Sequence, residues 1–502
     1  MPTPYDELPY PGSPFTQTHP DRLGTIATLF GMNPAPVERC RVLELGCGDG
    51  GNLIPMAFGL PRSIFTGIDL TGSAIARGQE LIDELRLANI HLKQLDLMDV
   101  TAEFGEFDYI IAHGLYSWVP PRVRERILEI CKSHLASNGI AFISYNTYPG
   151  GHLLEAIREM MFFHTRNAGS PRERLAQARD FLGFLFDAHP ENDAQAQFLK
   201  ADLKSCLERA PEVLYHDELA EHNHRFYFHE FAERLAAHGL QYLSEARTLP
   251  LQDDTHAGGM MEEIEAFSRG DPLVREQYLD FLKLRNFRQT LLCHAGAPRE
   301  QYPKRESVAA LAAAAQSEPS KPNPDLCSDA SETFVFPIGK LSTNHPLGKA
   351  ALWHLGRVWP RPIAFSELLA AARTLCHSEA RLNSALAEDA AWLSEKILKL
   401  FAVSFVELHS HIPGFAAAPS EQPVTSPLAR AQIKRGRTVT TLHHASVEVQ
   451  DDTARELLLL LDGTRNRAQL LAELRRDPSR EITPEQLEAN LNRLARMALL
   501  AA

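Results

Sequence analysis

The sequence has little that is typical of secreted, membrane-spanning or zinc-binding proteins. Its seven cysteines are scattered over 502 residues and never form a C-x-x-C pair, which argues against a disulfide framework or a cysteine zinc site. No apolar run approaches the roughly 18 residues that a membrane-spanning helix needs, and the first residues lack the basic and apolar regions of a signal peptide. We therefore expect a cytoplasmic protein without insertion into a membrane.

Positive charge is also scarce. Lysine and arginine number 51 against 64 aspartates and glutamates, so the net charge is −13 with histidine neutral. Binding to nucleic acid or to an anionic membrane needs a positive surface, so no nucleic-acid partner is expected. One compact basic patch contains Arg430, Lys434, Arg435 and Arg437. We interpret it first as a solvated lead into a strand, and second as a docking site for an acidic protein.

Apolar residues are plentiful enough for several hydrophobic cores, at 44% of the chain, and a chain of this length corresponds to about three domains. Strand-like runs alternate with helix-like stretches over the first 300 residues or so. This alternation predicts βαβ crossovers and a mostly parallel sheet. The expected strands are residues 41–46, 63–70, 90–97, 107–112, 140–145, 240–245 and 287–294.

Changes of pattern along the chain indicate where domains begin and end. The first domain is expected over residues 1–296, with a helical insert at about 152–228. A segment rich in proline, serine and alanine, residues 297–333, predicts a linker. Two small units of similar build follow, at 334–415 and 426–502. Three short helices with a flanking strand pair in each are typical of winged-helix-like folds.

The strongest local signal is the motif ELGCGDG, residues 44–50, directly after the first expected strand and before a helix. Glycines allow a sharp turn and a close approach of a ligand, because no Cβ stands in the way. Gly46, Gly48 and Gly51 also satisfy the dinucleotide spacing G-x-G-x-x-G. The loop by itself therefore leaves the cofactor open.

Acidic residues at three successive strand ends narrow the choice. Glu44 is placed to face an amino group, Asp69 to accept both hydroxyls of a ribose, and Asp96 to meet an adenine amine. Such a rim suits S-adenosylmethionine, which carries an amine and a sulfonium but no phosphate, whereas a pyrophosphate would be repelled. The alternative interpretation is a set of turn glycines with solvent-facing acids.

With these residues the sequence resembles the class I S-adenosylmethionine-dependent methyltransferases. It is most similar to a bacterial subfamily with a methyltransferase regulatory domain, which includes lysine methyltransferases of outer-membrane proteins. The segments that carry this closer resemblance are YDELPYPGSPFTQTHPDRL (5–23), HGLYSWVP (113–120), SYNTYPGG (144–151), YHDELAEHNHRFYFHEF (215–231), RNFRQTLLCHA (285–295), SPLARAQ (426–432) and LLDGTRNRAQLLAEL (460–474). The resemblance implies an α/β fold: a Rossmann-like seven-stranded methyltransferase sheet with an antiparallel last strand and helical inserts, followed by two small winged-helix-like α+β domains.

The resemblance also implies an enzyme that uses S-adenosylmethionine to N-methylate lysine side chains of a protein substrate. The residues implied to bind the cofactor are Glu44, Gly46, Cys47, Gly48, Gly50, Asp69, Leu70, Asp96, Leu97 and His113. Two alternatives stay open: methylation of a small molecule, and a non-catalytic protein that binds the cofactor and senses it. The two accessory domains suit either a large substrate or a homodimer.

The methyl acceptor is expected at the loops after the fourth and fifth strands, because open α/β folds bind ligands at the carboxyl edge of the sheet. A lysine, with an ordinary pKa near ~10.4, must lose its proton before transfer. An aromatic slot would lower that pKa by desolvation and hold cations against ring faces. Tyr116, Trp118 and Tyr145 are the candidates for this channel, with Asn146 as a polar anchor. The alternative is that they are ordinary core residues.

Two further groups of residues are expected near the cofactor. The N-terminal aromatic residues Tyr5, Tyr10 and Phe15 predict a lid across it, or else a proline-rich arm packed on the surface. The lid would bring Thr18, His19 or Arg22 to the methionine end. The histidines at 216, 222, 224 and 229 match no metal-ligand template, so no metal is expected. Residues 222–224 are interpreted as a loop over the active site.

Overall fold

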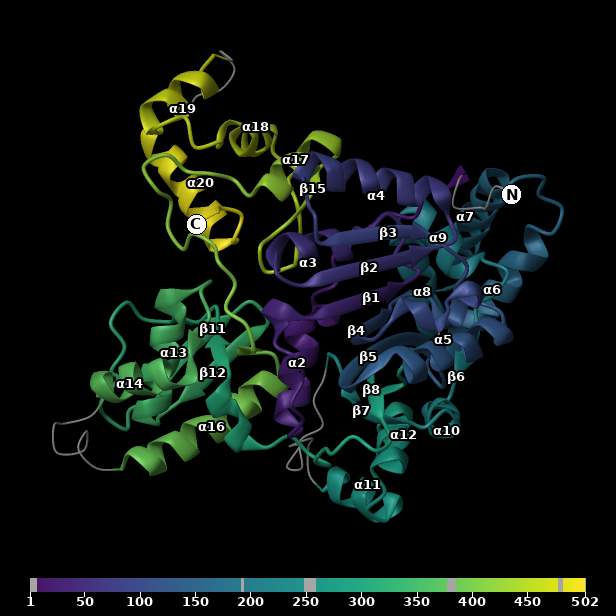
Figure 1. Ribbon diagram of the computed structural model, residues 1–502, viewed down its shortest axis with the longest axis horizontal. Coiled ribbons are helices and arrows are strands. Elements are labelled where there is room, and N and C mark those ends of the chain that lie inside the picture. The colour runs from purple at the N-terminus through teal and green to yellow at the C-terminus, as the bar shows by residue number, and fades with distance from the viewer. Residues whose placement is uncertain (1–6, 191–193, 248–258, 377–384, 477–481, 502) are drawn as a thin grey trace.

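A single β-sheet organises the first domain of the computed structural model, which describes residues 7–190, 194–247, 259–376, 385–476 and 482–501. Its strands are β1 (Arg41–Leu45), β2 (Ile64–Asp69), β3 (Ile90–Gln94), β4 (Phe107–Ala112), β5 (Leu135–Thr147), β6 (Arg225–Phe226), β7 (Leu240–Glu245) and β8 (Phe287–His294). The strand order is β3-β2-β1-β4-β5-β8-β7, with β6 paired to β5 (Figure 1). β8 runs antiparallel to both β5 and β7. The expected α/β sheet with an antiparallel last strand is confirmed, and the short β6 is an addition.

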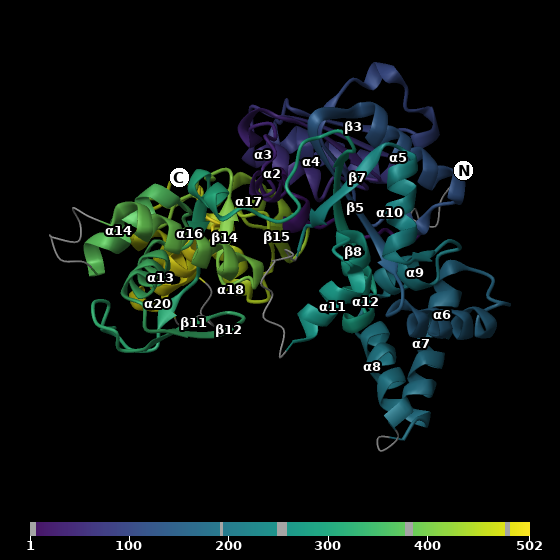
Figure 2. The same ribbon diagram turned by 90° about the horizontal axis from the view of Figure 1, so that it is seen from below.

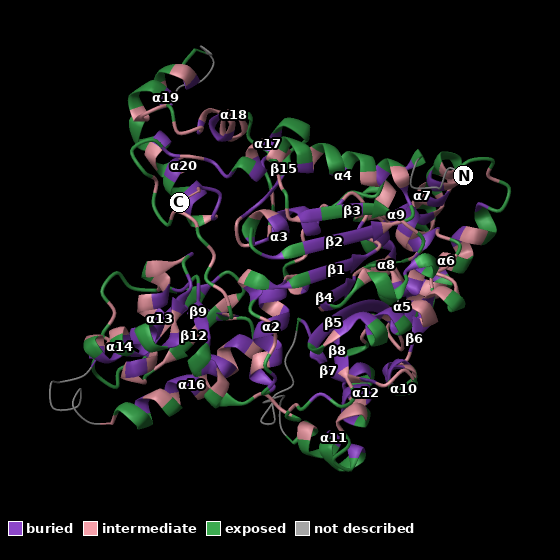
Figure 3. Cartoon of the chain, in the orientation of Figure 1, coloured by how far each residue is buried: buried purple, intermediate pink, exposed green. Residues whose placement is uncertain are grey.

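Helices cover both faces of this sheet, which explains why its strands read as nearly continuous apolar runs. The helices of the sheet layer are η1 (Thr16–Thr18), α2 (Pro20–Leu29), η2 (Val37–Arg39), α3 (Leu53–Gly59), α4 (Gly72–Leu85), η3 (Leu97–Asp99), η4 (Ala102–Phe104), η5 (Tyr116–Trp118), α5 (Pro121–His134), α10 (Phe228–Ala237), α11 (Met260–Ser268) and α12 (Pro272–Lys283). In Figure 3 the central strands are mostly buried, whereas the edge strand β3 and the outward faces of α4 and α11 are partly exposed.

The strand order locates the place where a ligand should bind. The chain builds outward from β1 through β2 to β3, and then returns to add β4 and β5 on the other side of β1. In open α/β sheets ligands bind outside the carboxyl ends of the strands at such a reversal. The loops after β1, β2 and β4 therefore surround the expected site.

A helical insert with a core of its own lies between β5 and β6. It contains α6 (Gly151–His164), α7 (Pro171–Ala188), α8 (Ala194–Glu208) and α9 (Pro211–Glu218). Its buried residues, among them Ile157, Met161 and Leu182, form a cluster separate from the sheet core. Figure 2 shows α7 and α8 projecting away from the sheet. Among the described residues no helix is both long enough and apolar enough to span a bilayer.

The middle of the chain differs from the linker expected at residues 297–333. This region contains η6 (Arg305–Ala310), β9 (Ala312–Ala314), β10 (Glu318–Pro319) and the start of β11 (Glu332–Phe336). β9 is the central strand of the sheet β13-β9-β14, and its three alanines are buried. The remaining elements are β12 (Gly339–Thr343), α13 (Pro346–Val358), β13 (Ile363–Ala364), α14 (Phe365–Cys376), α16 (Leu386–Ala402) and β14 (Glu407–His409). The small alanine side chains that suggest a linker instead allow α13 and α14 to pack closely on β9.

A buried ion pair joins this middle region to α2. The Asp21 carboxylate accepts hydrogen bonds from the backbone nitrogens of Ser410 (2.7 Å) and His411 (2.9 Å), and lies 2.7 Å from His409 Nδ1. Burial opposes ionisation of Asp21, but the charge of His409 outweighs it and lowers the pKa of Asp21 to about 2. Burial likewise opposes the charge on His409, yet Asp21 raises the pKa of His409 to about 10.

The stability contributed by His409 should therefore depend on pH. Because its pKa is raised from 6.5 to about 10 on folding, its contribution is complete below pH 6.5 and is lost as the pH rises through 10. We expect the advantage of the wild type over His409→Gln in unfolding free energy to be larger at pH 6 than at pH 9. Ser410→Ala removes a group that does not titrate, so its effect should be similar at both values. An equal His409→Gln effect at both would contradict the ion pair.

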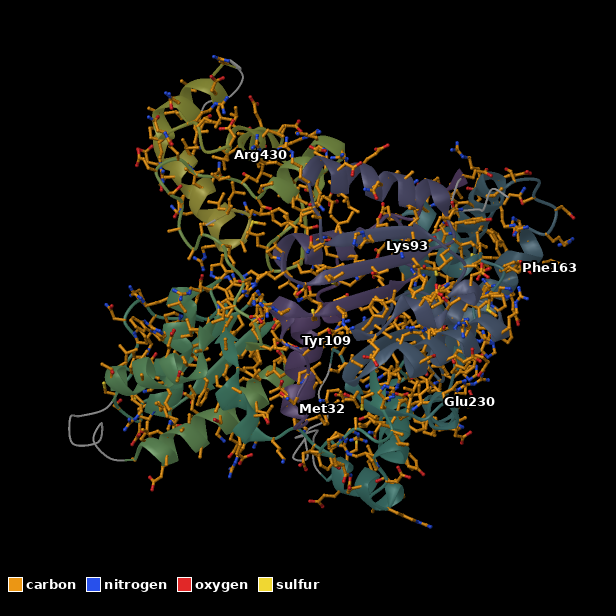
Figure 4. The ribbon with its side chains drawn as sticks, in the orientation of Figure 1. Met32, Lys93, Tyr109, Phe163, Glu230 and Arg430 are labelled. Atoms are coloured by element: carbon orange, nitrogen blue, oxygen red, sulfur yellow. The ribbon has the colours of Figure 1, made fainter. Side chains whose placement is uncertain are left out.

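The C-terminal domain has a separate core and contacts α4 through its first helix. Its elements are α17 (Pro427–Arg435), β15 (Thr438–Thr440), β16 (Ser446–Glu448), α18 (Asp452–Leu460), α19 (Arg467–Leu474) and α20 (Pro484–Arg496). Lys434 and Arg435 bind Glu84 on α4, at 3.1 and 2.6 Å. Arg430 lies on α17, above the sheet domain in Figure 4. Arg437 is exposed and directly precedes β15, as expected of a solvated strand lead, whereas Lys434 and Arg435 lie on α17 and pair with the first domain.

Candidate active site

The glycine-rich loop turns sharply at the end of β1. The backbone nitrogens of Gly46 and Cys47 both donate to the carbonyl of Ile68, at 2.8 and 3.1 Å. Gly46 and Gly48 have backbone φ angles of 72° and 56°, which residues other than glycine rarely adopt. A Cβ added to Gly48 would have nothing within 4 Å. The loop therefore leaves open space beside its backbone.

Acidic residues from two neighbouring strand ends lie at the same edge. Asp69 accepts from the Gly48 nitrogen at 2.9 Å and from the Thr71 nitrogen at 2.8 Å. Asp96 is exposed and accepts from the Met98 nitrogen at 2.9 Å. The apolar residues expected beside them differ in exposure, since Leu97 is buried and Leu70 is 58% exposed. Each carboxylate oxygen accepts more than one hydrogen bond, so both acids can still bind a ligand.

Glu44 lies beneath the loop and is poised for a cation. Its Oε1 accepts a hydrogen bond from Asn52 Nδ2 at 2.7 Å. Its Oε2 is buried and has no hydrogen-bond partner among the described residues. Burial raises the pKa of Glu44 to about 8. A buried carboxylate of this kind is stabilised when a cationic group reaches the free oxygen.

The N-terminal arm crosses the glycine-rich loop. A Cβ on Gly51 would lie 2.6 Å from the Cα of Gly12, so the two backbones nearly touch. Phe15 donates its backbone N–H to Asn52 Oδ1 at 2.9 Å, and its ring lies 4.0 Å from that of His113. Of the expected lid residues, Tyr5 lies outside the described residues, and Tyr10 instead packs against His216 of the insert, with ring centroids 5.9 Å apart.

Of the three residues expected at the methionine end of the cofactor, Thr18 and Arg22 lie in different surroundings. Thr18 is fully buried and accepts a hydrogen bond from Asn52 Nδ2 at 3.0 Å. Arg22 instead donates to the carbonyl of Ala246 at 2.8 Å and lies over the ring of Phe401 in the middle region. Arg22 therefore takes part in domain docking.

Trp118 and Asn146, two of the residues predicted to hold the methyl acceptor, lie at the carboxyl ends of β4 and β5 and contact the helical insert. Asn146 Nδ2 donates to Asn223 Oδ1 at 2.8 Å. Trp118 Nε1 and Asn223 Nδ2 both donate to the carbonyl of Asp217, at 3.3 and 2.6 Å. The loop at 222–224 thus closes against the ends of β4 and β5. Trp118, Asn146 and Asn223 are each half-buried, so part of each side chain is exposed, and the acceptor role of Trp118 and Asn146 stays a prediction.

Tyr116 and Tyr145 do not line an open channel in this structure. Both rings are 0% exposed and lie in the core between the sheet and α10. Tyr145 packs on Phe231 with ring centroids 4.2 Å apart, and Tyr116 packs on Phe226 at 5.4 Å. These two tyrosines are therefore core residues in this structure, which was the alternative to a place in the acceptor channel, because β6 and α10 cover them.

His113 follows β4 and is uncharged at neutral pH. Its Nδ1 lies 2.9 Å from Ser144 Oγ, which also accepts the backbone N–H of Gly114 at 2.8 Å. Burial lowers the pKa of His113 to about 4. A neutral imidazole adds no positive charge to the place where the sulfonium of the expected cofactor would lie.

The other histidines singled out in the sequence are dispersed. The Nε2 atom of His216 lies 2.5 Å from the carbonyl oxygen of Leu8. The Nδ1 atom of His229 lies 3.0 Å from Gln277 Oε1. Within the part of the chain that the structure describes, no three histidine, cysteine, aspartate or glutamate side chains are arranged to hold a metal ion.

Comparison with protein families matches three parts of the chain. Residues 43–141 match a methyltransferase domain, residues 210–294 a predicted methyltransferase regulatory domain, and residues 421–483 the C-terminal winged helix domain of PKMT, the protein lysine methyltransferases. The matched regulatory domain thus begins near α9 and extends to the end of β8, whereas the sequence pattern predicted a helical regulatory insert at about 152–228.

A relative from Rickettsia prowazekii decides the family. The uncharacterized protein RP789 is 34% identical over 457 residues, which cover 89% of this chain and 81% of RP789. The chain belongs to the class I methyltransferases that carry a regulatory domain. A second relative from the same organism, uncharacterized protein RP028, is 41% identical over 231 residues, or 46% of this chain and 92% of RP028.

Two solved structures superpose on this methyltransferase over nearly its whole length. PKMT2 from Rickettsia typhi superposes with a TM-score of 0.87 at 28% identity, covering 98% of this chain and 100% of PKMT2. A second structure of PKMT2 contains AdoHcy, the demethylated form of the cofactor, and superposes equally well. The chain is therefore an S-adenosylmethionine-dependent enzyme.

The residues present fit S-adenosylmethionine. The free Oε2 of Glu44 suits the amine, the open space beside Gly48 suits the methionine chain, and the carboxylate of Asp69 suits the ribose. Exposed Leu70 offers an apolar surface to an adenine ring. When bound, the cofactor supplies a methyl group activated by its sulfonium. The role of each of these residues stays a prediction.

Two residues that organise this methyltransferase site were not predicted from the sequence. Asn52 binds Glu44, Thr18 and the backbone of Phe15, and its only sequence signal is its place two residues after the glycine motif. Ser117 Oγ accepts the backbone N–H of Asn146 at 2.8 Å and so joins the two acceptor-side loops. No pattern in the sequence marks that contact.

Proposed function

We propose that this methyltransferase transfers a methyl group from S-adenosylmethionine to the amine of lysine side chains in a protein substrate. The observation that carries the proposal is the extent of the similarity to PKMT2, which includes the accessory domains and reaches 98% of the chain. A likeness confined to the catalytic sheet would support the cofactor alone. The winged helix domain at residues 421–483 is one that lysine methyltransferases carry.

The acceptor side has chemistry that suits a lysine. Transfer is an in-line displacement, so holding the amine against the methyl group contributes much of the rate. Trp118 offers an aromatic face and Asn146 a polar group, while the neutral ring of His113, which follows β4, packs against the Phe15 ring with centroids 4.0 Å apart. Such surroundings favour the uncharged amine by desolvation. No described side chain is assigned as a general base.

The test is methyl transfer from labelled S-adenosylmethionine to fractionated bacterial lysate, including an outer-membrane protein fraction. We expect label on protein that mass spectrometry maps to lysine. Label confined to small molecules would replace the proposal with small-molecule methylation. Binding of the cofactor without any labelled product would instead support a non-catalytic sensor.

Trp118→Ala separates the acceptor side from the cofactor side. We expect cofactor affinity within about threefold of the wild type and a transfer rate lowered about 10- to 100-fold, because the acceptor is held less well. Calorimetry measures the first quantity and single-turnover transfer the second. Trp353→Ala is the matched control, since Trp353 is also half-buried but lies on α13 beside Arg357. Loss of cofactor binding in Trp118→Ala would place Trp118 in the wrong pocket.

A further inference from the structure

A loop of the C-terminal domain reaches the cofactor side of the first domain. His444 lies between β15 and β16, is 5% exposed, and has a φ of 58°. Its Nε2 lies 2.9 Å from Asn52 Oδ1, across 392 positions of sequence. The carbonyl of the same residue accepts a hydrogen bond from Thr16 of the arm at 3.0 Å. His444 therefore contacts both the arm and the residue that follows the glycine motif.

The bonds around Asn52 determine how these groups are protonated. Asn52 Nδ2 donates to Thr18 and to Glu44 Oε1, so Oδ1 is the acceptor for the backbone N–H of Phe15. His444 must then donate its Nε2–H to Oδ1. Burial keeps the pKa of His444 well below its ordinary value, in agreement with a neutral ring that carries one proton.

These contacts form a chain that ends at the free oxygen of Glu44. His444 and the arm hold the amide of Asn52 in one orientation, and that amide holds Glu44 Oε1 at 2.7 Å. Glu44 Oε2 is left without a partner among the described residues, at the end of β1. If the amide of Asn52 turned, Glu44 Oε1 would lose its hydrogen-bond donor, and the Glu44 carboxylate would no longer be held in one orientation.

We propose that His444 is a positioning residue of the cofactor site, which makes the C-terminal domain part of that site. It acts through Asn52 on Glu44 and does not need to touch the cofactor. Because binding free energies are coupled reciprocally, the cofactor in turn strengthens the contact of residues 441–445 with the first domain. The inference rests on the cofactor and not on the identity of the acceptor.

The neighbouring residue provides a matched control. His443 lies on the same loop, and both histidines line a cavity of about 290 Å³ between α3, the middle region and the C-terminal domain. Its ring stacks on Trp359, with centroids 5.9 Å apart, and no bond joins it to Asn52 among the described contacts. A change at His443 disturbs the loop and leaves the contact with Asn52 in place.

The first test compares affinities for S-adenosylmethionine and AdoHcy by calorimetry. We expect His444→Ala to bind about 5- to 30-fold more weakly, since one buried hydrogen bond is lost, and His443→Ala to bind within about twofold of the wild type. His444→Gln should recover most of the affinity, because its amide nitrogen reaches about as far as Nε2. Wild-type affinity in folded His444→Ala, or an equal loss in His443→Ala, would overturn the proposal.

The second test asks whether His444 acts through Asn52. If it does, the double variant His444→Ala with Asn52→Ala should bind no more weakly than Asn52→Ala alone. Hydrogen exchange gives an independent readout: the cofactor should slow exchange of residues 441–445 in the wild type and less so in His444→Ala. Additive losses in affinity, or exchange of this loop that does not respond to the cofactor, would overturn the proposal. His444→Gln keeps the test open if the alanine variant does not fold.

Discussion

Replacing Asp69 with alanine should lower the affinity for S-adenosylmethionine by more than about a hundredfold. The carboxylate assigned to the ribose would make two charge-assisted hydrogen bonds, each contributing about 1.5–3 kcal/mol. The same change also removes the acceptor of the Gly48 and Thr71 nitrogens, which shape the loop. Calorimetry with S-adenosylmethionine and with AdoHcy measures the effect directly.

Asp99→Ala is the control for this change. Asp99 is an exposed acid on η3 at the same edge of the sheet, so the comparison separates a specific contact from a general loss of negative charge. Circular dichroism should show that both variants are folded. Unchanged affinity in Asp69→Ala would refute the ribose assignment and leave the family and the cofactor as they stand.

Arg288→Met should destabilise the first domain by about 3–5 kcal/mol, the usual cost of removing one partner from a buried ionic cluster. The Arg288 side chain is 0% exposed and binds Asp280 through two bonds of 2.8 Å. It also binds Glu245 at 2.7 Å and Glu276 at 3.1 Å. Without it, three carboxylates lie close together in the interior with too little positive charge. Denaturant unfolding monitored by hydrogen exchange of β7 and β8 measures the loss.

Two further variants define what Arg288 contributes. Arg288→Lys keeps the charge but cannot bind Asp280 through two parallel bonds, so an intermediate loss is expected. Arg305→Met removes an arginine that is 52% exposed and pairs with Glu306, and because such surface pairs contribute little to stability, we expect almost no loss. A loss below about 1 kcal/mol in Arg288→Met would mean that the cluster does not stabilise the sheet.

Much of the first domain could be predicted because its strands have strong local patterns. The expected strand at residues 287–294 coincides with β8, and that at 41–46 extends one residue beyond β1. Both are apolar runs bounded by turn residues, and such runs need no knowledge of distant neighbours. The antiparallel direction of β8 came from the family resemblance, because an isolated apolar run does not reveal the direction of its pairing.

The acceptor side could be predicted only in part. Sequence order places Tyr116 and Tyr145 next to Trp118 and Asn146, but the structure buries the two tyrosines under β6 and α10. Which residue of a loop is covered depends on the segment that later packs on it. The same holds for residues 297–333, where a linker-like composition hides β9, since alanines suit both an extended linker and a close-packed central strand.

The sequence by itself determined the class of fold, the glycine-rich loop and the acids at the strand ends, because each depends on residues close together in the chain. The tertiary structure alone decided which distant residues meet, both between domains and beside the cofactor site. The contacts of Asp21 with His409 and of Asn52 with His444 join residues that are 388 and 392 positions apart. No periodicity or motif records such a pair, because each becomes a neighbour only after separate domains have packed together.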